Sequence, residues 1–276
     1  MNISEHITHF EQEMRRRFFS KQTIENYSSC IKKFFHWSTK DHPKNINEKD
    51  IRNFLSKFDT PNTQRAYHSA IKKFYEICLN QKEKFKYIPY CRKDHKLPIV
   101  LSQEEVQRMF DVCKNLKHKT IMCLLYSCGL RVSELINLKW SHIDRSRMVI
   151  NILGAKGNKD RQVPLSEVII PTLIAYYKKY TPKDYILNGW KNEPQYSDTS
   201  VREVVKQLAK KAGINKRVYT HLMRHNCFTH MVENGVDINL IQRLAGHASV
   251  KTTTIYTHIS HNIISKIKSP IDNINI

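Results

Sequence analysis

Hydrophobic side chains recur every three or four positions through most of the first eighty residues, with lysine and serine between them. That spacing places the apolar positions on one face of a helix. It predicts helices over residues 22–38, 48–58 and 62–79, and Pro61 suits the first turn of the last one. We expect four short helices in this part, packed into one compact domain.

Residues 91–98 interrupt this pattern. They read CRKDHKLP, a polar and basic run that ends in proline, which is typical of a linker. Soon after it, Ser102 and Glu105 have the spacing of a capping box, so we expect a new helix to begin near residue 103. The sequence therefore predicts three segments: a helical domain over residues 1–93, a linker over 94–101 and a second domain over 102–276.

The second part has a mixed pattern. Two short apolar runs, residues 148–153 and 161–165, flank the turn-rich text GAKGNKD and predict a β-hairpin. Seven stretches in which apolar residues recur every three or four positions predict helices, and Gly213, Gly235 and Gly246 follow three of them. We place these at 103–115, 117–128, 131–138, 166–180, 200–212, 222–233 and 238–245. The expected fold class is mainly α with a small β-hairpin or sheet (α+β).

The net charge of the chain indicates what kind of partner it could bind. The chain carries 46 Lys and Arg against 25 Asp and Glu, a formal net charge of +21. Residues 1–98 have 20 basic and 11 acidic side chains (+9), and residues 99–276 have 26 and 14 (+12). Both parts are therefore candidates for contact with phosphate, and nucleic acid is the commonest polyanionic partner. The alternative is a basic surface that only meets solvent.

Other classes of protein find little support. The seven cysteines are odd in number and show no CxxC spacing, so neither a disulfide framework nor a zinc ribbon is expected. The first residues lack the basic and apolar runs of a secretory leader, and no apolar stretch is long enough to span a bilayer. We expect a cytoplasmic protein that has no contact with a membrane.

Two basic residues lie where they could meet an anion. Arg131 follows Gly129 at the start of a predicted helix, a position from which a guanidinium can be aimed at a phosphate. Lys156 lies in the turn of the predicted hairpin and could reach a phosphate or a DNA groove. Taken alone, each is more simply explained as a solvated surface side chain.

Two further signals lie near the end of the chain. His221 and Arg224 are three residues apart and share one face of a helix. His247 follows the helix-ending Gly246, and Tyr256 comes nine residues later. His221 and His225 also have a zinc-like spacing, but no HExxH glutamate or cysteine pair accompanies them, so we expect no metal.

The order of these residues resembles the tyrosine recombinase family, which includes phage integrases and Xer-type recombinases. The matching text is YSCGLRVSEL, GAKGNKDRQVPL, THLMRHNCFTHMVENGVD and IQRLAGHASVKTTTIYTH. The resemblance covers the whole second part, and the first part resembles the family's SAM-like core-binding domain more loosely. Met223 and Ala245 stand where the family usually has leucine, and both are apolar replacements.

The resemblance implies site-specific DNA recombination through a 3′-phosphotyrosyl intermediate, without metal, ATP or another cofactor. It implies a catalytic role for six residues. Tyr256 is the nucleophile, His221 the general base and Lys156 the general acid, while Arg131, Arg224 and His247 bind the phosphate. These roles suit the chemistry, because guanidinium groups stay charged and imidazole titrates near neutrality.

The expected partner is double-stranded DNA, bound between the two domains by a homotetramer, with a partner recombinase or a DNA-bending protein as a further candidate. The tail, residues 259–276, packs either on a neighbouring protomer or on its own domain. Integration or excision of a mobile element, inversion and chromosome-dimer resolution all remain open. The alternative functions are a type IB topoisomerase, a non-catalytic DNA-binding protein and, in principle, a nuclease.

Overall fold

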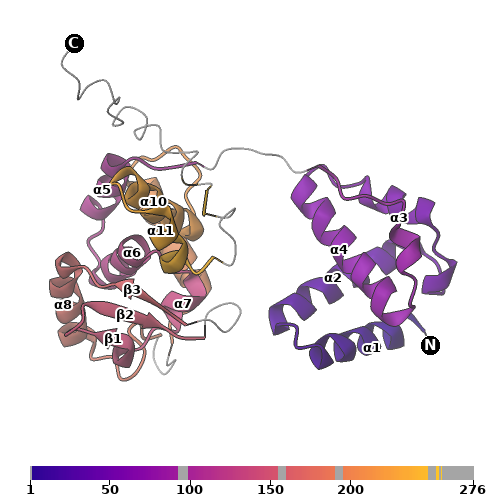
Figure 1. Cartoon of the computed structure of the whole chain (residues 1–276), viewed down its shortest axis with the longest axis horizontal. Helices are drawn as coiled ribbons and strands as arrows, with labels where there is room; N and C mark the ends of the chain where they lie inside the picture. Colours follow the sequence, from indigo (N-terminus) through magenta and orange to yellow (C-terminus); the bar gives the residue numbers. More distant parts are fainter. Residues whose placement is uncertain are drawn as a thin grey trace, which may run out of the picture. The chain divides into compact units, whose positions relative to one another are not determined.

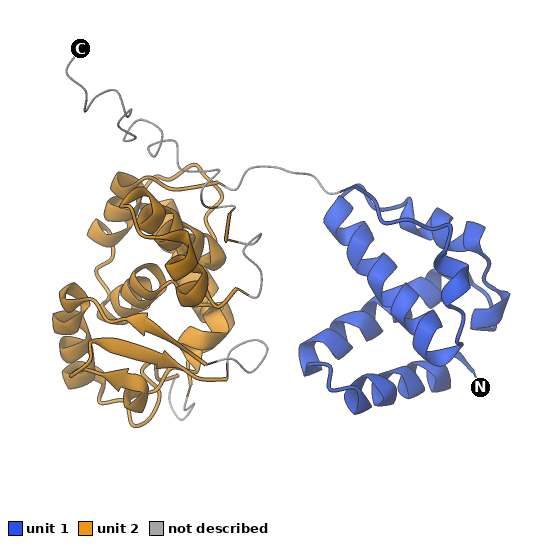
Figure 2. Ribbon diagram, in the orientation of Figure 1, with its two compact units in different colours: residues 1–96 blue, residues 97–276 orange. Residues whose placement is uncertain are grey.

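The structure is a computed structural model that describes residues 2–92, 99–154, 160–189, 195–247, 253, 254 and 256. The chain forms two compact units, residues 1–96 and residues 97–276 (Figure 2). Three sequence predictions fall outside the described residues: most of the linker, the turn with Lys156, and the tail.

Unit 1 is helical (Figure 1). Its four α-helices are α1 (Ile3–Arg16), α2 (Lys21–Ser38), α3 (Glu48–Leu55) and α4 (Pro61–Cys78), joined by the 3-10 helix η1 (Pro43–Asn45) and followed by η2 (Lys82–Phe85). Asn2 and Asn47 begin α1 and α3, and each forms a capping box with an acidic residue three positions later. The prediction of a helical first part is confirmed.

Aromatic side chains fill the core of unit 1. Phe10, Phe34, Phe74 and Tyr75 are completely buried, and Phe54 packs edge-on against Phe34 with 5.0 Å between ring centroids. These rings come from four amphipathic helices, so the charged positions of the same helices face outward. Unit 1 is therefore a small domain with its own hydrophobic core.

Unit 2 is built around two buried helices, α6 and α10. Its α-helices are α5 (Gln103–Asp111), α6 (Leu116–Cys128), α7 (Val132–Ile136), α8 (Ile170–Tyr180), α9 (Asp198–Lys211), α10 (Thr220–Glu233) and α11 (Ile238–Ala245). Two 3-10 helices, η3 (Trp140–His142) and η4 (Glu167–Ile169), precede β1 and α8. α6 and α10 pack against each other, and both are buried on most sides rather than along one stripe. Helices of that kind belong inside a domain.

A three-stranded antiparallel sheet lies at one end of unit 2 (Figure 1). Its strands are β1 (Ile143–Asp144), β2 (Val149–Ile152) and β3 (Arg161–Pro164), in the order β1-β2-β3. The hairpin expected from the sequence is β2 and β3, paired as Ile150 with Val163 and Ile152 with Arg161. β1 was not predicted, because two residues are too short to show an alternating pattern.

Several predicted helices end or begin elsewhere; α3, for example, ends at Leu55 rather than at residue 58. Two of the differences have a clear local cause. The helix expected over 103–115 ends at Asp111, because Asn115 caps the next helix by accepting the His118 N–H at 3.1 Å. The helix expected over 166–180 is split into η4 and α8, with Pro171 in the first turn of α8. Proline lacks the N–H that a continuous helix would need there.

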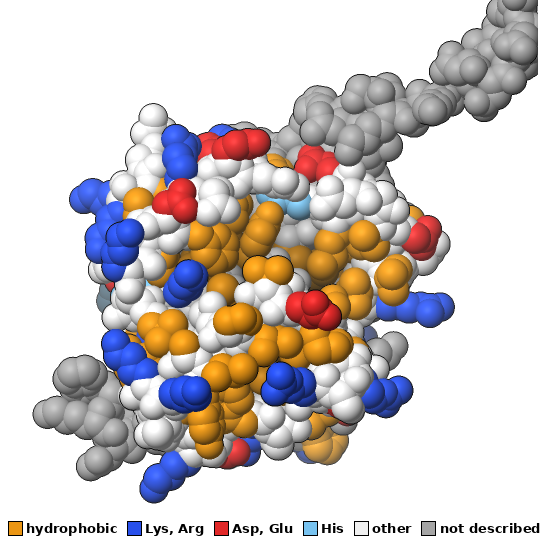
Figure 3. Space-filling view, turned by 90° about the vertical axis from the view of Figure 1, so that its left-hand side faces the viewer, with side chains coloured by type: hydrophobic (Ala, Val, Ile, Leu, Met, Phe, Trp, Pro, Cys, Tyr) orange, Lys and Arg blue, Asp and Glu red, His pale blue; other side chains and the backbone are white. Residues whose placement is uncertain are grey.

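One face of unit 2 is hollowed and largely hydrophobic (Figure 3). The cavity has a volume of about 680 Å³ and lies between α5, α6, η4 and α10, with Phe110, Tyr126, Val168 and Met231 among its lining residues. Val168 is 84% exposed. In the described part of the chain, no helix has the length and apolarity that a membrane crossing requires.

Candidate active site

Arg131 enters the site from the turn between α6 and α7. Gly129 ends α6 with a positive φ of 58°, and a Cβ at that position would lie only 2.6 Å from the Phe228 ring, so the turn requires glycine. Arg131 then caps α7, and the Glu134 carboxylate accepts both its backbone N–H at 2.8 Å and its Nη1 at 2.6 Å. The Arg131 side chain remains 24% exposed.

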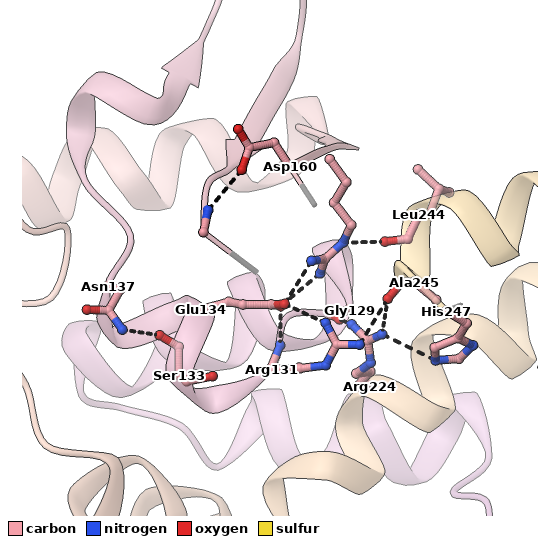
Figure 4. Close-up of polar contacts among 12 residues, drawn as sticks. Gly129, Arg131, Ser133, Glu134, Asn137, Asp160, Arg224, Leu244, Ala245 and His247 are labelled. Atoms are coloured by element: carbon pink, nitrogen blue, oxygen red, sulfur yellow. Dashed lines mark hydrogen bonds and ion pairs between the residues drawn. The ribbon is translucent and has the colours of Figure 1, made fainter. Parts of the chain in front are cut away.

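Arg224 reaches the same place from α10, inside the protein. It is 1% exposed, and its Nη1 donates to the Gly129 carbonyl at 2.5 Å. Its Nη2 donates to the Ala245 carbonyl, which also accepts from Arg131 Nη2 at 3.3 Å (Figure 4). Burial lowers the pKa of Arg224 to about 10, and the Arg131 charge adds to that effect. Arg224 is therefore still a cation at neutral pH.

The end of α11 places His247 beside this pair. Gly246 ends the helix with a φ of 60°, and His247 follows directly. His247 Nε2 lies 3.5 Å from Arg224 Nη2, and its Nδ1 lies 3.0 Å from Thr253 Oγ1. An arginine can only donate, so Nε2 accepts and Nδ1 carries the hydrogen. Burial, together with the charges of Arg224 and Arg131, lowers the pKa of His247 to about 4.

Tyr256 is buried against the same group of residues. It is 1% exposed, and its ring lies 5.7 Å from Phe228 and 6.1 Å from His247, measured between centroids. Burial raises the pKa of Tyr256 to about 12, although the positive charge of Arg224 opposes the shift. The phenol is therefore neutral at physiological pH, and a base has to accept its proton before it can act as a nucleophile.

Two histidines of α10 lie between the protein surface and Tyr256. His221, in the first turn of α10, is exposed on one side and packs edge-on against His225 at 4.7 Å between centroids. The His225 ring in turn lies 5.7 Å from the Tyr256 ring. Desolvation lowers the pKa of both imidazoles, that of His225 to about 4, and the nearby Arg224 contributes. Neutral imidazoles can accept a proton.

Five of the six residues predicted from the sequence thus lie in one site: Arg131, His221, Arg224, His247 and Tyr256. They come from the α6–α7 turn, α10 and the segment after α11. The sixth, Lys156, lies outside the described residues. On either side of the segment that holds Lys156, the Gly154 N–H donates to Asp160 Oδ1 at 2.9 Å.

Two charged residues of the site received no role from the sequence. Arg161 donates to both carboxylate oxygens of Glu134, each at 2.7 Å, and its Nε donates to the Leu244 carbonyl at 2.7 Å. Burial would raise the pKa of Glu134, but hydrogen bonds from Arg161 and Arg131 outweigh it and lower this pKa to about 2. The sequence did contain a signal for each of these two residues. Glu134 has capping-box spacing from Arg131. Arg161 lies two positions before the buried Val163, so both side chains point to the same face of the strand.

This arrangement suits a phosphodiester. Two guanidinium groups and an imidazole approach one point beside a tyrosine, and such groups stabilise charge on phosphate oxygens. In the described ranges, no group of three or more His, Cys, Asp or Glu side chains could hold a metal ion. The positive charge beside the Ala245 carbonyl comes from Arg131 and Arg224.

Residues 100–262 match the phage integrase family, and residues 7–84 match the phage integrase N-terminal SAM-like domain. The tyrosine recombinase XerC of Staphylococcus saprophyticus is 32% identical over 269 residues, covering 90% of this chain and 90% of that protein. The tyrosine recombinase XerA of Pyrococcus horikoshii is 34% identical over 269 residues, covering 94% and 89%.

Solved structures agree with this assignment. The crystal structure of XerA recombinase is 30% identical with a TM-score of 0.57, covering 95% of this chain and 96% of that one. A lambda integrase dimer bound to a COC′ core site, at 17% identity, has a TM-score of 0.76 over 91% and 97% of the two chains, which supports the fold alone. The resemblance seen in the sequence is confirmed: the chain belongs to the phage integrase family and is a tyrosine recombinase, an enzyme that recombines DNA at specific sites by cleaving and rejoining its strands.

Proposed function

We propose that this recombinase cleaves DNA by forming a 3′-phosphotyrosyl bond at Tyr256 while Arg131, Arg224 and His247 bind the scissile phosphate. One observation carries the proposal. Both arginines bond to the Ala245 carbonyl, and His247 lies within 3.5 Å of Arg224 while its ring packs against Tyr256. Phosphate receptors and nucleophile are thereby gathered around one point.

The reaction exchanges one phosphate ester for another. The Tyr256 oxygen forms a bond to phosphorus, and the bond from phosphorus to the 5′-oxygen breaks. The energy of the broken phosphodiester bond is retained in the phosphotyrosyl bond, so rejoining needs no ATP. Charge grows on the non-bridging oxygens during this step, and each preorganised donor is worth a few kcal/mol (~3) there. Arg131 and Arg224 supply permanently charged donors, and His247 supplies another once its Nε2 carries a proton.

Two proton transfers accompany this exchange. His221 is our candidate for the base that takes the Tyr256 proton, because its pKa is lowered and it stands at the solvent side of the site. His225 contacts both His221 and Tyr256 and offers a path between them. Lys156, which lies between β2 and β3 in the sequence, is the candidate acid for the leaving 5′-oxygen, an assignment that rests on the family resemblance.

The working assembly is proposed from relatives and from charge. A lambda integrase tetramer has been seen on a Holliday junction, and recombination of two duplexes requires four cleavages. Four copies of this chain on DNA would meet that need, and the formal charges of +9 and +12 on residues 1–98 and 99–276 favour phosphate contact by both parts. The hydrophobic hollow of Figure 3 is a surface suited to contact between copies.

The test is capture of the covalent intermediate. Wild-type chain would be incubated with duplexes that contain a randomised core, and DNA that stays attached on a denaturing gel would be amplified until one site dominates. A nicked form of that site, which loses its 5′-hydroxyl fragment, should trap nearly all of the enzyme, with EDTA present. Adduct at no sequence, or adduct only when magnesium is restored, would contradict the proposal.

A further inference from the structure

We propose that Arg161 is a positioning residue for this reaction: it holds the end of α11, and therefore His247, against the Glu134 and Arg131 pair. This inference rests on the proposed function. Arg161 lies at the start of β3, opposite Ile152, with its side chain on the same side of the strand as the buried Val163. The strand thus directs a charged side chain toward the protein interior.

The contacts of Arg161 join two separate segments. Nη1 and Nη2 donate to the two oxygens of Glu134 in α7, and Nε donates to the carbonyl of Leu244 in the last turn of α11. A planar guanidinium makes such a fork with defined geometry, which lysine cannot reproduce. Arg161 therefore links α7 to the end of α11, beside the contact that Arg131 makes with the Ala245 carbonyl.

The end of α11 is where the phosphate-binding residues meet. Leu244 and Ala245 present two consecutive carbonyls that the helix itself leaves without partners. Arg161 donates to the first, and Arg131 and Arg224 donate to the second. A shift of this turn would therefore displace both arginines, and it would also displace His247, two residues after Ala245.

Gly246 provides a second, independent sign of a fitted contact. A Cβ built on Gly246 would lie 3.1 Å from Arg161 Cδ and 3.6 Å from its Nε. The arginine stem thus lies directly over the glycine that reverses the chain before His247. Cations near a helix C-terminus also interact favourably with its carbonyls.

Arg161 acts through these neighbours rather than on the DNA itself. Its side chain is 6% exposed, and Nε, Nη1 and Nη2 each donate a hydrogen bond within the protein. It also shares Glu134 with Arg131, since Glu134 Oε1 accepts from both. Without Arg161, the carboxylate would be left to Arg131 alone and would draw its donors away from the phosphate.

The experiment measures single-turnover cleavage of the nicked site selected above by the wild-type chain. Arg161→Met should leave DNA affinity near wild type and slow cleavage at saturating DNA by roughly 10- to 100-fold, the loss typical when a supporting contact is removed. Arg161→Lys should recover only part of the rate. Arg202→Met, which removes an exposed arginine paired with Asp198 on α9, is the matched control and should behave as wild type.

A double-mutant cycle separates positioning from a general structural role. If Arg161 acts by placing His247, Arg161→Met should cost clearly less in a His247→Ala background than in the wild type. Fully additive losses, an unchanged cleavage rate, or a loss of DNA affinity as large as the loss of rate would each overturn the inference.

Thermal melting of every variant accompanies these rates, and Arg161→Lys carries the same cycle if Arg161→Met does not fold. A wild-type chain that forms no adduct would overturn the proposed function and this inference with it. A wild-type adduct together with an unaffected Arg161→Met rate would overturn this inference alone.

Discussion

The rings of His247 and Tyr256 lie nearly parallel, 18° between planes and 6.1 Å between centroids. The same imidazole faces Arg224 through Nε2 and Thr253 through Nδ1. One side chain therefore contacts both the proposed nucleophile and a phosphate-binding arginine. In the DNA-free protein it accepts from that arginine, and a bound phosphate would require it to donate instead.

The titration of His247 should therefore depend on DNA. Its pKa is lowered to about 4 in the free protein, so the ring should stay neutral down to that pH. A phosphate beside it would favour the charged form and raise its pKa. NMR of histidine-labelled protein, with His247→Gln to identify the signal, measures both values. A free-protein pKa near the ordinary value of about 6.5, or no rise on DNA binding, would contradict this account.

Glu134 should make unfolding sensitive to acid. Its folded pKa of about 2 lies below the ordinary 4.5, so its stabilising effect is complete above 4.5 and is lost as the pH falls toward 2. The full shift corresponds to about 3 kcal/mol of unfolding free energy. Urea unfolding between pH 5 and about 2.5 should show this loss in the wild type and much less of it in Glu134→Gln. Glu203→Gln, an exposed change on α9, should retain the wild-type dependence.

Two glycines with the same backbone conformation give a matched comparison. Gly213 and Gly246 have φ values of 64° and 60°, so alanine costs roughly 1–2 kcal/mol at either position. Only at Gly246 does the new Cβ also meet Arg161; at Gly213 it meets no described atom within 4 Å. Gly246→Ala should therefore lower the unfolding free energy more than Gly213→Ala does, and should alone slow cleavage. Equal effects of the two changes would show that Arg161 is not fitted to Gly246.

DNA affinity should fall steeply with salt. With formal charges of +9 and +12 on residues 1–98 and 99–276, most contacts should be to phosphate. The logarithm of the binding constant should then fall by about 0.9 per logarithmic unit of salt for each phosphate neutralised. Fluorescence anisotropy on the selected site and on a random duplex measures the slope. An affinity that salt leaves unchanged would rule out binding through both parts.

The sequence predicted most of this fold because its signals are local. α11 was expected over 238–245 and has those bounds, since Gly246 ends it with a left-handed residue. The capping box at Ser102 likewise begins α5 where expected. β1 and the division of residues 166–180 were missed, because the first depends on pairing with β2 and the second on Pro171.

The sequence predicted those site residues that stand in a recognisable local motif. Arg131, His221, Arg224, His247 and Tyr256 were found in their motifs, and the structure places them together. Arg161 and Glu134 received no role, although both lie in quoted motifs. The ion pair of Arg161 and Glu134 joins positions 27 residues apart in sequence, and the hydrogen bond from Arg161 to Leu244 spans 83 residues. Such contacts appear only once β3, α7 and α11 are folded against one another.

The most direct test of the central claim is the Tyr256→Phe variant, which removes the phenolic oxygen and keeps a ring in the packing around Phe228. It should fold, bind the selected site with near wild-type affinity, and form no covalent adduct on the nicked substrate. Tyr219→Phe, at a tyrosine 43% exposed beside α10, is the control and should form adduct as the wild type does. Adduct that persists in Tyr256→Phe, or that disappears in Tyr219→Phe instead, would contradict the assignment of Tyr256 as the nucleophile.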